Sequence, residues 1–231
     1  MNLPPLRSRF FLLACGCWCA LTLAAQAADY RLEPLDEAAP AEDLSDEVAA
    51  RLQSTGVRII RGASRTLCDL WLAKELPGQS DFTPTSAVLY PFNTGELIGV
   101  VRFTSNSEDF RGQDIKAGVY TLRFGLQPVD GNHVGTSDTR DFLLLLSAGD
   151  DTSAAVMDEF EMFQMSSDAV GTTHPGMLPL LAVRDDDRDR PSLDHDEPRE
   201  LWYVRLTADC NSAGESQQLP IDLVIVGRAP E

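Results

Sequence analysis

The residue types best suited to chemistry are three histidines, His133, His174 and His195, which all fall in segments that read as loops. Imidazole nitrogens combined with carboxylates are common zinc ligands. One interpretation therefore joins the three histidines, with Asp130 or Asp194, into the metal site of a secreted hydrolase. No H-x-H or H-E-x-x-H spacing accompanies them. The simpler interpretation is three exposed histidines with no catalytic role.

An acidic run between residues 185 and 197 offers oxygen ligands of the kind that calcium prefers. Asp185, Asp187 and Asp189 would take the first, third and fifth positions of an EF-hand loop, with Asp196 at the twelfth. Arg190 stands where that loop requires glycine, and no helical pattern flanks the run. A solvated loop with interspersed arginines fits better. A calcium-dependent carbohydrate-binding or adhesion module is the alternative.

A long polar loop, residues 127–139, lies between two predicted strands. Long loops on a rigid scaffold often carry binding residues, and the polar candidates here are Asp130, Asn132, His133 and Asp138. Asp130 is followed by glycine, a pair typical of a turn. The loop is therefore either a binding loop or an exposed connection, and the second interpretation is the simpler one.

No motif in the chain specifies a reaction. There is no G-x-S-x-G elbow, no usable S-x-x-K and no glycine-rich phosphate loop, so nucleophilic and phosphate-transfer chemistry have no support. The aromatic residues that could stack on a sugar, Trp71, Trp202, Tyr90 and Tyr203, lie inside apolar runs and are expected in the core. These observations favour a non-enzymatic binding or envelope-structural protein without a resident cofactor.

The N-terminus has the pattern of a cleavable export signal. Arg7 and Arg9 precede an apolar run over 10–23, and Ala25-Gln26-Ala27 matches the A-x-A cleavage site. We predict a signal peptide over 1–27 and a periplasmic or extracellular product. The apolar run is too short to span a membrane. An alternative start resembles a lipobox, in which Cys15 would be lipidated.

The net charge of −17 limits the choice of partners. Such a surface repels phosphate backbones and anionic membranes, which excludes nucleic acid and a lipid surface as expected partners. A protein or carbohydrate ligand is left open.

Two cysteines, Cys68 and Cys210, lie outside the signal segment. An even pair in an oxidising compartment predicts a disulfide. Two buried free thiols are the alternative.

Short apolar runs separated by turn residues begin at residue 56 and predict an all-β domain over 56–228. They indicate a two-sheet antiparallel β-sandwich, of jelly-roll or Ig-like type, with one short helix over 153–165. Segment 28–55 is rich in acids and is expected to be a flexible leader. The predicted strands cover 57–61, 66–72, 87–92, 97–104, 119–126, 141–146, 178–183, 200–208 and 221–226.

The stretch from Gly112 to Leu122, with Ile115, Ala117-Gly118, Tyr120 and Leu122 in an I-x-A-G-x-Y-x-L pattern, continues to a run over 140–145. It resembles strand entries in families of secreted bacterial β-sandwich proteins with no assigned function. The resemblance covers about 95–150 and implies an exported sandwich fold. It carries over no catalytic residue.

Overall fold

The computed structural model describes residues 29–129, 137–184 and 189–229. The predicted signal peptide and Cys15 lie outside these residues. In the part that is described, the chain forms one large sheet, a two-stranded ribbon, two α-helices, α1 (Asp46–Arg51) and α2 (Glu159–Val170), and two 3-10 turns, η1 (Ala41–Asp43) and η2 (Glu197–Arg199). None of the helices in these ranges is long and apolar enough to cross a membrane.

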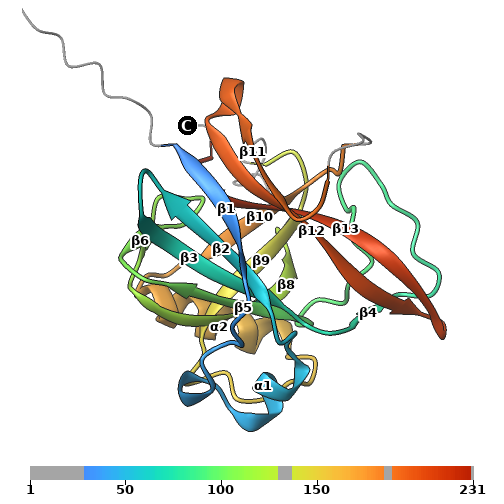
Figure 1. Ribbon diagram of the computed structural model, residues 1–231. Helices are drawn as coiled ribbons and strands as arrows, with labels where there is room; N and C mark the ends of the chain where they lie inside the picture. Colours follow the sequence, from blue (N-terminus) through green and yellow to red (C-terminus); the bar gives the residue numbers. More distant parts are fainter. Residues whose placement is uncertain (1–28, 130–136, 185–188, 230–231) are drawn as a thin grey trace, which may run out of the picture.

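The large sheet is antiparallel along its main path and curls into a barrel-like form (Figure 1). Its two edge strands, β1 and β11, come back into contact with each other. Strand β4 (Leu76–Gly78) adds in parallel to β12, and β6 (Ser107–Glu108) pairs with β7 (Asp114–Ile115). The path runs β1 (Tyr30–Leu35), β2 (Gly56–Arg61), β3 (Arg65–Leu72), β5 (Leu97–Phe103), β8 (Gly118–Leu126), β9 (Asp141–Ser147), β10 (Met177–Leu181), β13 (Glu215–Val226), β12 (Leu201–Ser212) and β11 (Ser192–Asp196).

The predicted all-β class is confirmed, whereas the sheet is nearly closed instead of clearly split into two layers. Strand β10 shows the physical reason. Its first half, Met177–Pro179, pairs with β9, and its second half, Leu180–Leu181, pairs with β13. One short strand thus joins what would otherwise be two sheets, and the pairing continues around the corner.

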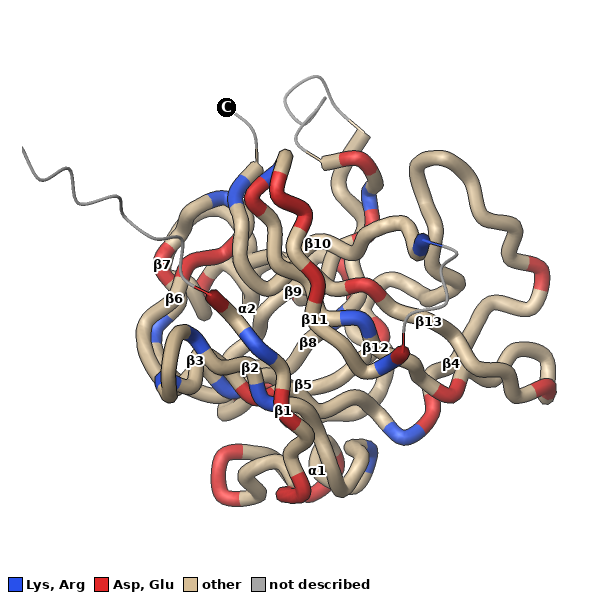
Figure 2. Tube along the Cα trace, turned by 45° about the horizontal axis from the view of Figure 1, so that its top comes forward, with Lys and Arg blue, Asp and Glu red and all other residues tan. Residues whose placement is uncertain are grey.

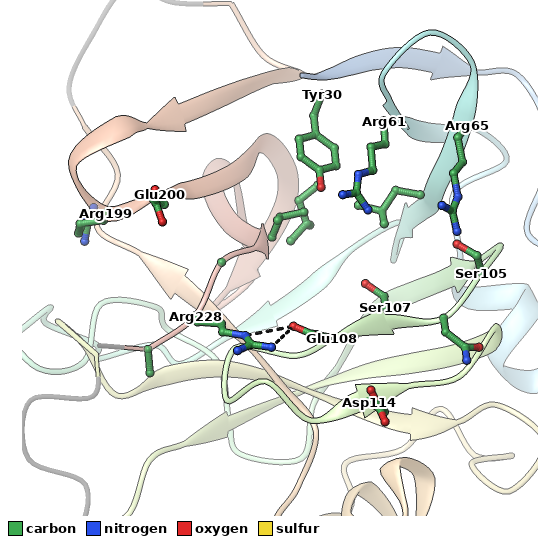
Figure 3. A pocket seen from close by; sticks show the side chains of 16 residues that line it. Tyr30, Arg61, Arg65, Ser105, Ser107, Glu108, Asp114, Arg199, Glu200 and Arg228 are labelled. Atoms are coloured by element: carbon green, nitrogen blue, oxygen red, sulfur yellow. Dashed lines mark hydrogen bonds and ion pairs between the residues drawn. The ribbon is translucent and has the colours of Figure 1, made fainter. Parts of the chain in front are cut away.

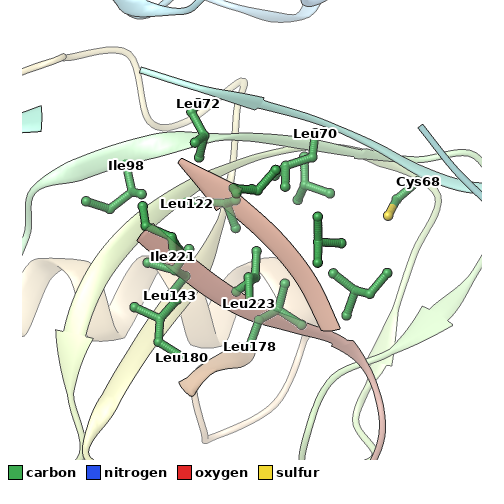
Figure 4. Close-up of a cluster of buried hydrophobic side chains, with 14 of the residues drawn as sticks. Cys68, Leu70, Leu72, Ile98, Leu122, Leu143, Leu178, Leu180, Ile221 and Leu223 are labelled. Carbon is green, nitrogen blue, oxygen red and sulfur yellow. The ribbon is translucent and has the colours of Figure 1, made fainter. Parts of the chain in front are cut away.

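The interior is filled by apolar side chains from most strands of the path (Figure 4). Leu70, Leu122, Leu143 and Leu223 are each at most 2 % exposed. Burying one such side chain contributes about 1.5–3 kcal/mol. This packing holds the strands in place, including the strand ends at which the cavity described below is found.

Cys68 and Cys210 are both buried in this interior and are free thiols. Cys68 lies on β3, which pairs with β2 and β5, whereas Cys210 lies on β12 between β13 and β4. The two strands are not neighbours in the sheet. The predicted disulfide is therefore wrong, and the alternative of two buried thiols holds.

The acidic segment before residue 56 is structured, which corrects the expected flexible leader. Strand β1 pairs with β2 along its whole length. Ser45 caps α1 by accepting a hydrogen bond from the Val48 N–H at 3.1 Å. Leu35, Leu44 and Val48 pack around Trp71 on the outer side of the sheet. The few apolar residues of this segment are thus buried, while most of its acids stay exposed.

The longer of the two α-helices in the described ranges, α2, begins six residues later than the predicted 153–165. Asp158 caps it by accepting hydrogen bonds from the backbone N–H groups of Phe160 and Glu161. Met162 is buried against β9, whereas Phe160 is 78 % exposed. The helix covers the outer face of the sheet at β9, and Ala169 and Val170 at its C-terminal end pack against the interior cluster.

The predicted strand over 87–92 does not form. The Asp141 carboxylate accepts hydrogen bonds from the backbone N–H groups of Leu89 and Tyr90. Because a side chain takes these donors, the segment does not join a strand ladder. Burial raises the pKa of Asp141, and these hydrogen bonds oppose that rise.

Candidate functional site

A cavity of about 750 Å³ lies at one end of the barrel-like sheet (Figure 3). This end gathers the start of β1, the β2–β3 hairpin, the end of β5 and the end of β13. The β6–β7 ribbon, inserted between β5 and β8, supplies a further wall. The lining residues are Tyr30, Arg61, Arg65, Leu67, Ser105, Asn106, Ser107, Glu108, Asp114, Arg199, Glu200, Ile225, Val226, Gly227, Arg228 and Ala229.

Three of these residues form a row across adjacent strands. Tyr30 on β1 pairs with Arg61 on β2, and Arg61 pairs with Arg65 on β3. Directly paired residues point to the same face of a sheet. The row therefore faces the cavity as a unit, as the side chains in Figure 3 show.

The row continues the inward-facing positions of the same strands. Leu32 follows Tyr30 on that face of β1, Ile59 precedes Arg61 on β2, and Leu67 comes after Arg65 on β3; all three pack in or against the interior cluster. The inner face of the sheet thus changes from apolar to cationic at this end. Because inward-facing positions are two residues apart along a strand, the change takes place between one inward-facing residue and the next.

Three of the seven charged residues that line the cavity, Glu108, Arg199 and Arg228, have ionic partners. Arg228 donates from Nε to Glu108 Oε2 at 3.1 Å, which joins the end of β13 to the ribbon. Arg199 pairs with Asp196 through Nε at 2.9 Å and also with Asp138. These contacts fix the positions of their guanidinium groups.

Arg61 and Arg65 differ, because neither forms an ion pair with any residue in the described ranges. The guanidinium carbon of Arg61 lies 5.9 Å from the ring centre of Tyr30, in a cation–π contact. Burial raises the pKa of the Tyr30 hydroxyl, against the opposing effect of Arg61 and Arg65. The hydroxyl is therefore protonated at neutral pH and can donate a hydrogen bond into the cavity.

An aromatic stack lies beside the cavity, where the two edge strands β1 and β11 come into contact. Trp202 on β12 stacks on His195 of β11, with ring centres 4.2 Å apart and planes 9° from parallel. Trp202 also meets Tyr30 of β1 at 5.2 Å. Rings from β1, β11 and β12 therefore bridge the two edge strands, and His195 has a structural contact.

The structure does not bring the predicted metal-ligating histidines together among the residues it describes. His174 lies after α2 at the rim of a second, smaller cavity of about 180 Å³, mainly apolar, between α2 and β8–β9. His195 lies in the aromatic stack on the edge strand β11. No group of three or more histidines, cysteines or acids in the described ranges is placed to hold a metal ion. His133 and Asp130 are outside those ranges.

The remaining predicted ligands either lie outside the described residues, are exposed or are paired with arginine. Asn132, Asp185 and Asp187 also lie outside the described residues, and Asp189 is exposed. Asp138 pairs with Arg199 at 2.5 Å. Asp196, the twelfth position of the suggested calcium loop, is buried and bound to Arg199 and Arg184, which lower its pKa. Its carboxylate is therefore already neutralised by arginine.

Two other charged clusters are structural. Arg123 and Asp151 are fully buried and bonded at 2.6 Å, and Arg123 also donates to the carbonyls of Gly95, Ser153 and Ala155. Asp69 is buried between two arginines on the outer face of β2, β3 and β5, where Figure 2 shows basic residues gathered. These donors and acceptors are satisfied within the protein, so they leave little for a ligand.

Sequence reasoning missed the cavity residues, although a signal was present. Arg58, Arg61 and Arg65 cluster in a strongly acidic chain. Strand alternation places Arg61 on the same face as Val57 and Ile59, the apolar residues of the same run. An arginine continuing an apolar face is the pattern that would have indicated the site.

Comparison of the chain with protein-family models, with curated proteins and with solved structures gives no match.

Proposed function

We propose that this chain is an exported, non-enzymatic binding protein that holds a small molecule in the cavity at the end of the sheet. The observation that carries the proposal is the cavity itself, about 750 Å³ in volume and lined by side chains from five parts of the chain. Ligand sites are concave and measure about 300–1,000 Å³, and they occur often at the mouths of barrel-like folds.

The chemistry of the lining supports binding more than catalysis. The described lining residues include the hydroxyls of Ser105 and Ser107, but no histidine, cysteine or lysine. An activated serine needs a neighbouring base. Hydrogen-bond donors above an apolar floor, which Leu67 and Ile225 provide, suit a polar ligand that is held and released unchanged.

Export supports the same role. The basic start, the apolar run and the A-x-A site of residues 7–27 predict passage through the secretory route. A protein that acts outside the cytoplasm and has a preformed cavity of about 750 Å³ fits the capture of a ligand. An envelope-structural role would not need the cavity.

A substitution that fills the cavity with a bulky side chain tests the proposed binding function. Ser107 lies on the β6–β7 ribbon and its side chain points into the cavity (Figure 3). We expect a library of small sugars and organic acids to contain compounds that raise the melting temperature of the mature wild-type protein, because a ligand that binds only the folded state stabilises it. Ser107→Trp should abolish this response by occupying the space.

The matched control is Ser107→Ala, which removes the hydroxyl without filling the cavity and should keep most of the response. If Ser107→Trp is folded and responds to the same compounds as the wild type, ligands bind elsewhere and the proposal is wrong.

A further inference from the structure

We infer that the ligand carries an oxyanion, a carboxylate or a phosphate, which binds between Arg61 and Arg65. This inference rests on the proposed function of the cavity and names the chemistry of its ligand. Arginine presents a planar fork of donors that matches the two oxygens of either group.

The register of the β2–β3 hairpin carries the argument. Arg61 and Arg65 are directly opposite each other on neighbouring strands. Like charges in such a pair destabilise a sheet, and neither arginine is paired with an acid in the described ranges. An anion bound between the two guanidinium groups would turn this repulsion into two attractive contacts.

The charge of the cavity is opposite in sign to that of the whole chain. Four arginines and three acids line it, which gives 4 − 3 = +1, while the full sequence has a net charge of −17. Glu108 is neutralised by Arg228. Glu200 lies near Arg199, on the side of the cavity opposite Arg61 and Arg65 in Figure 3. Arg199 is paired with Asp196 and Asp138. Asp114 lies on the ribbon, across the cavity from the hairpin (Figure 3). The lining arginines that have no ion pair in the described ranges are therefore both on the hairpin.

Several neutral groups complete the site. The Tyr30 hydroxyl points into the cavity next to Arg61, and the hydroxyls of Ser105 and Ser107 face it from the opposite wall (Figure 3). The Tyr30 ring orients Arg61 through the cation–π contact at 5.9 Å. A ligand with one anionic group and further hydroxyl or carbonyl oxygens would therefore find donors on both sides.

Calorimetric titration of the mature protein with two anionic probes tests the inference. Inorganic pyrophosphate represents the phosphate source and glucuronate the carboxylate source, while glucose is the neutral match of glucuronate. We expect at least one anion to bind the wild type, and glucose to bind at least tenfold more weakly than glucuronate where glucuronate is the binder. Arg61→Gln and Arg65→Gln should each weaken anion binding about tenfold, the effect of losing one charge-assisted contact.

Lys116→Gln is the matched control, because Lys116 follows β7 at the same end of the sheet, is exposed and does not line the cavity. It makes the same change in charge and should keep wild-type affinity. Arg65→Gln should melt at or above the wild-type temperature, since it removes a like-charge pair. Arg61→Gln removes the same pair but also the cation–π contact with Tyr30, so it should melt close to the wild-type temperature. That readout separates loss of binding from loss of folding.

Failure of the oxyanion inference can be distinguished from failure of the proposed binding function. If neither anion binds, or if both arginine variants bind as the wild type does, the oxyanion inference is wrong. If in addition Ser107→Trp responds to the compound library as the wild type does, the cavity is not the ligand site and the proposed function fails too. Neutral ligands that bind the wild type but not Ser107→Trp would leave the binding function standing without the oxyanion.

Discussion

At the scale of single residues, the buried carboxylates and arginines of this protein differ in how well they are satisfied. Asp69 and Asp151 each have arginine partners within 2.6 Å. Glu96 does not: it is 4 % exposed, and its Oε2 atom lacks a hydrogen-bond partner among the described residues. A buried acceptor without a partner carries a desolvation cost.

Glu96 gives a prediction with a defined pH dependence. Burial raises the pKa of its carboxyl, against the opposing effect of Arg51 and Arg123. Because the folded pKa lies above the unfolded one, the charged form lowers stability at neutral pH. This loss shrinks as pH falls through the folded pKa and is gone below the unfolded pKa. Glu96→Gln should therefore raise the free energy of unfolding at pH 7 by about 1 kcal/mol, with little gain at pH 4.

Urea denaturation at the two pH values measures this difference, with Glu161→Gln on the exposed face of α2 as the control. The explanation fails if Glu96→Gln is less stable than the wild type at pH 7, or if the gain is the same at both pH values.

The residue scale also shows what could be read from the sequence of the candidate site. Tyr203 and Tyr90 are buried as predicted, and Trp71 is fully buried. Among the described residues, the histidines and acids singled out for their reactivity do not line the cavity. The type of a residue does not reveal at which end of the sheet the fold will place it. The arginines that do line the cavity look like ordinary surface charges until strand pairing puts Arg61 opposite Arg65.

At the scale of elements, long apolar runs were informative and short or polar ones were not. Every predicted strand except 87–92 forms, and the boundaries of β5, β8 and β9 agree within one residue. Strands β1 and β11 were missed because they are short edge strands in which charged and polar residues interrupt the apolar pattern. Strand β1 is defined by its pairing with β2 beyond α1, and β11 by its hairpin with β12, and the residue pattern of neither strand reveals this pairing.

The connection between β9 and α2 gives a prediction at this scale. Asp151, in the connection after β9, holds Arg123 of β8 in a fully buried pair. Asp151→Ala leaves a buried cation without its partner, which costs about 3–5 kcal/mol. The neighbouring Asp150 is exposed, so Asp150→Ala should change stability by less than about 0.5 kcal/mol. Guanidinium denaturation compares the two variants, and equal losses would show that the buried pair is not what stabilises this junction.

At the scale of the whole molecule, the sequence predicted the all-β class but did not predict that the sheet curls until its two edge strands are in contact. Alternating runs look the same in a sandwich and in a curled sheet, since both bury one face. The difference lies in β10, where Pro179 stands at the change of pairing partner from β9 to β13. That closure produces the cavity, because it brings the start of β1 and the end of β13 to one rim (Figure 1).

The most direct test of the account is the response of the arginine side chains themselves. In ¹⁵N-labelled mature protein, the Nε–H signals of Arg61 and Arg65 can be assigned with the two glutamine variants and followed during titration with pyrophosphate and with glucuronate. We predict that both signals shift together and saturate with at least one anion, while the signal of Arg51, on α1 away from the cavity, stays in place. Shifts spread evenly over the arginines, or none at Arg61 and Arg65, would contradict the account.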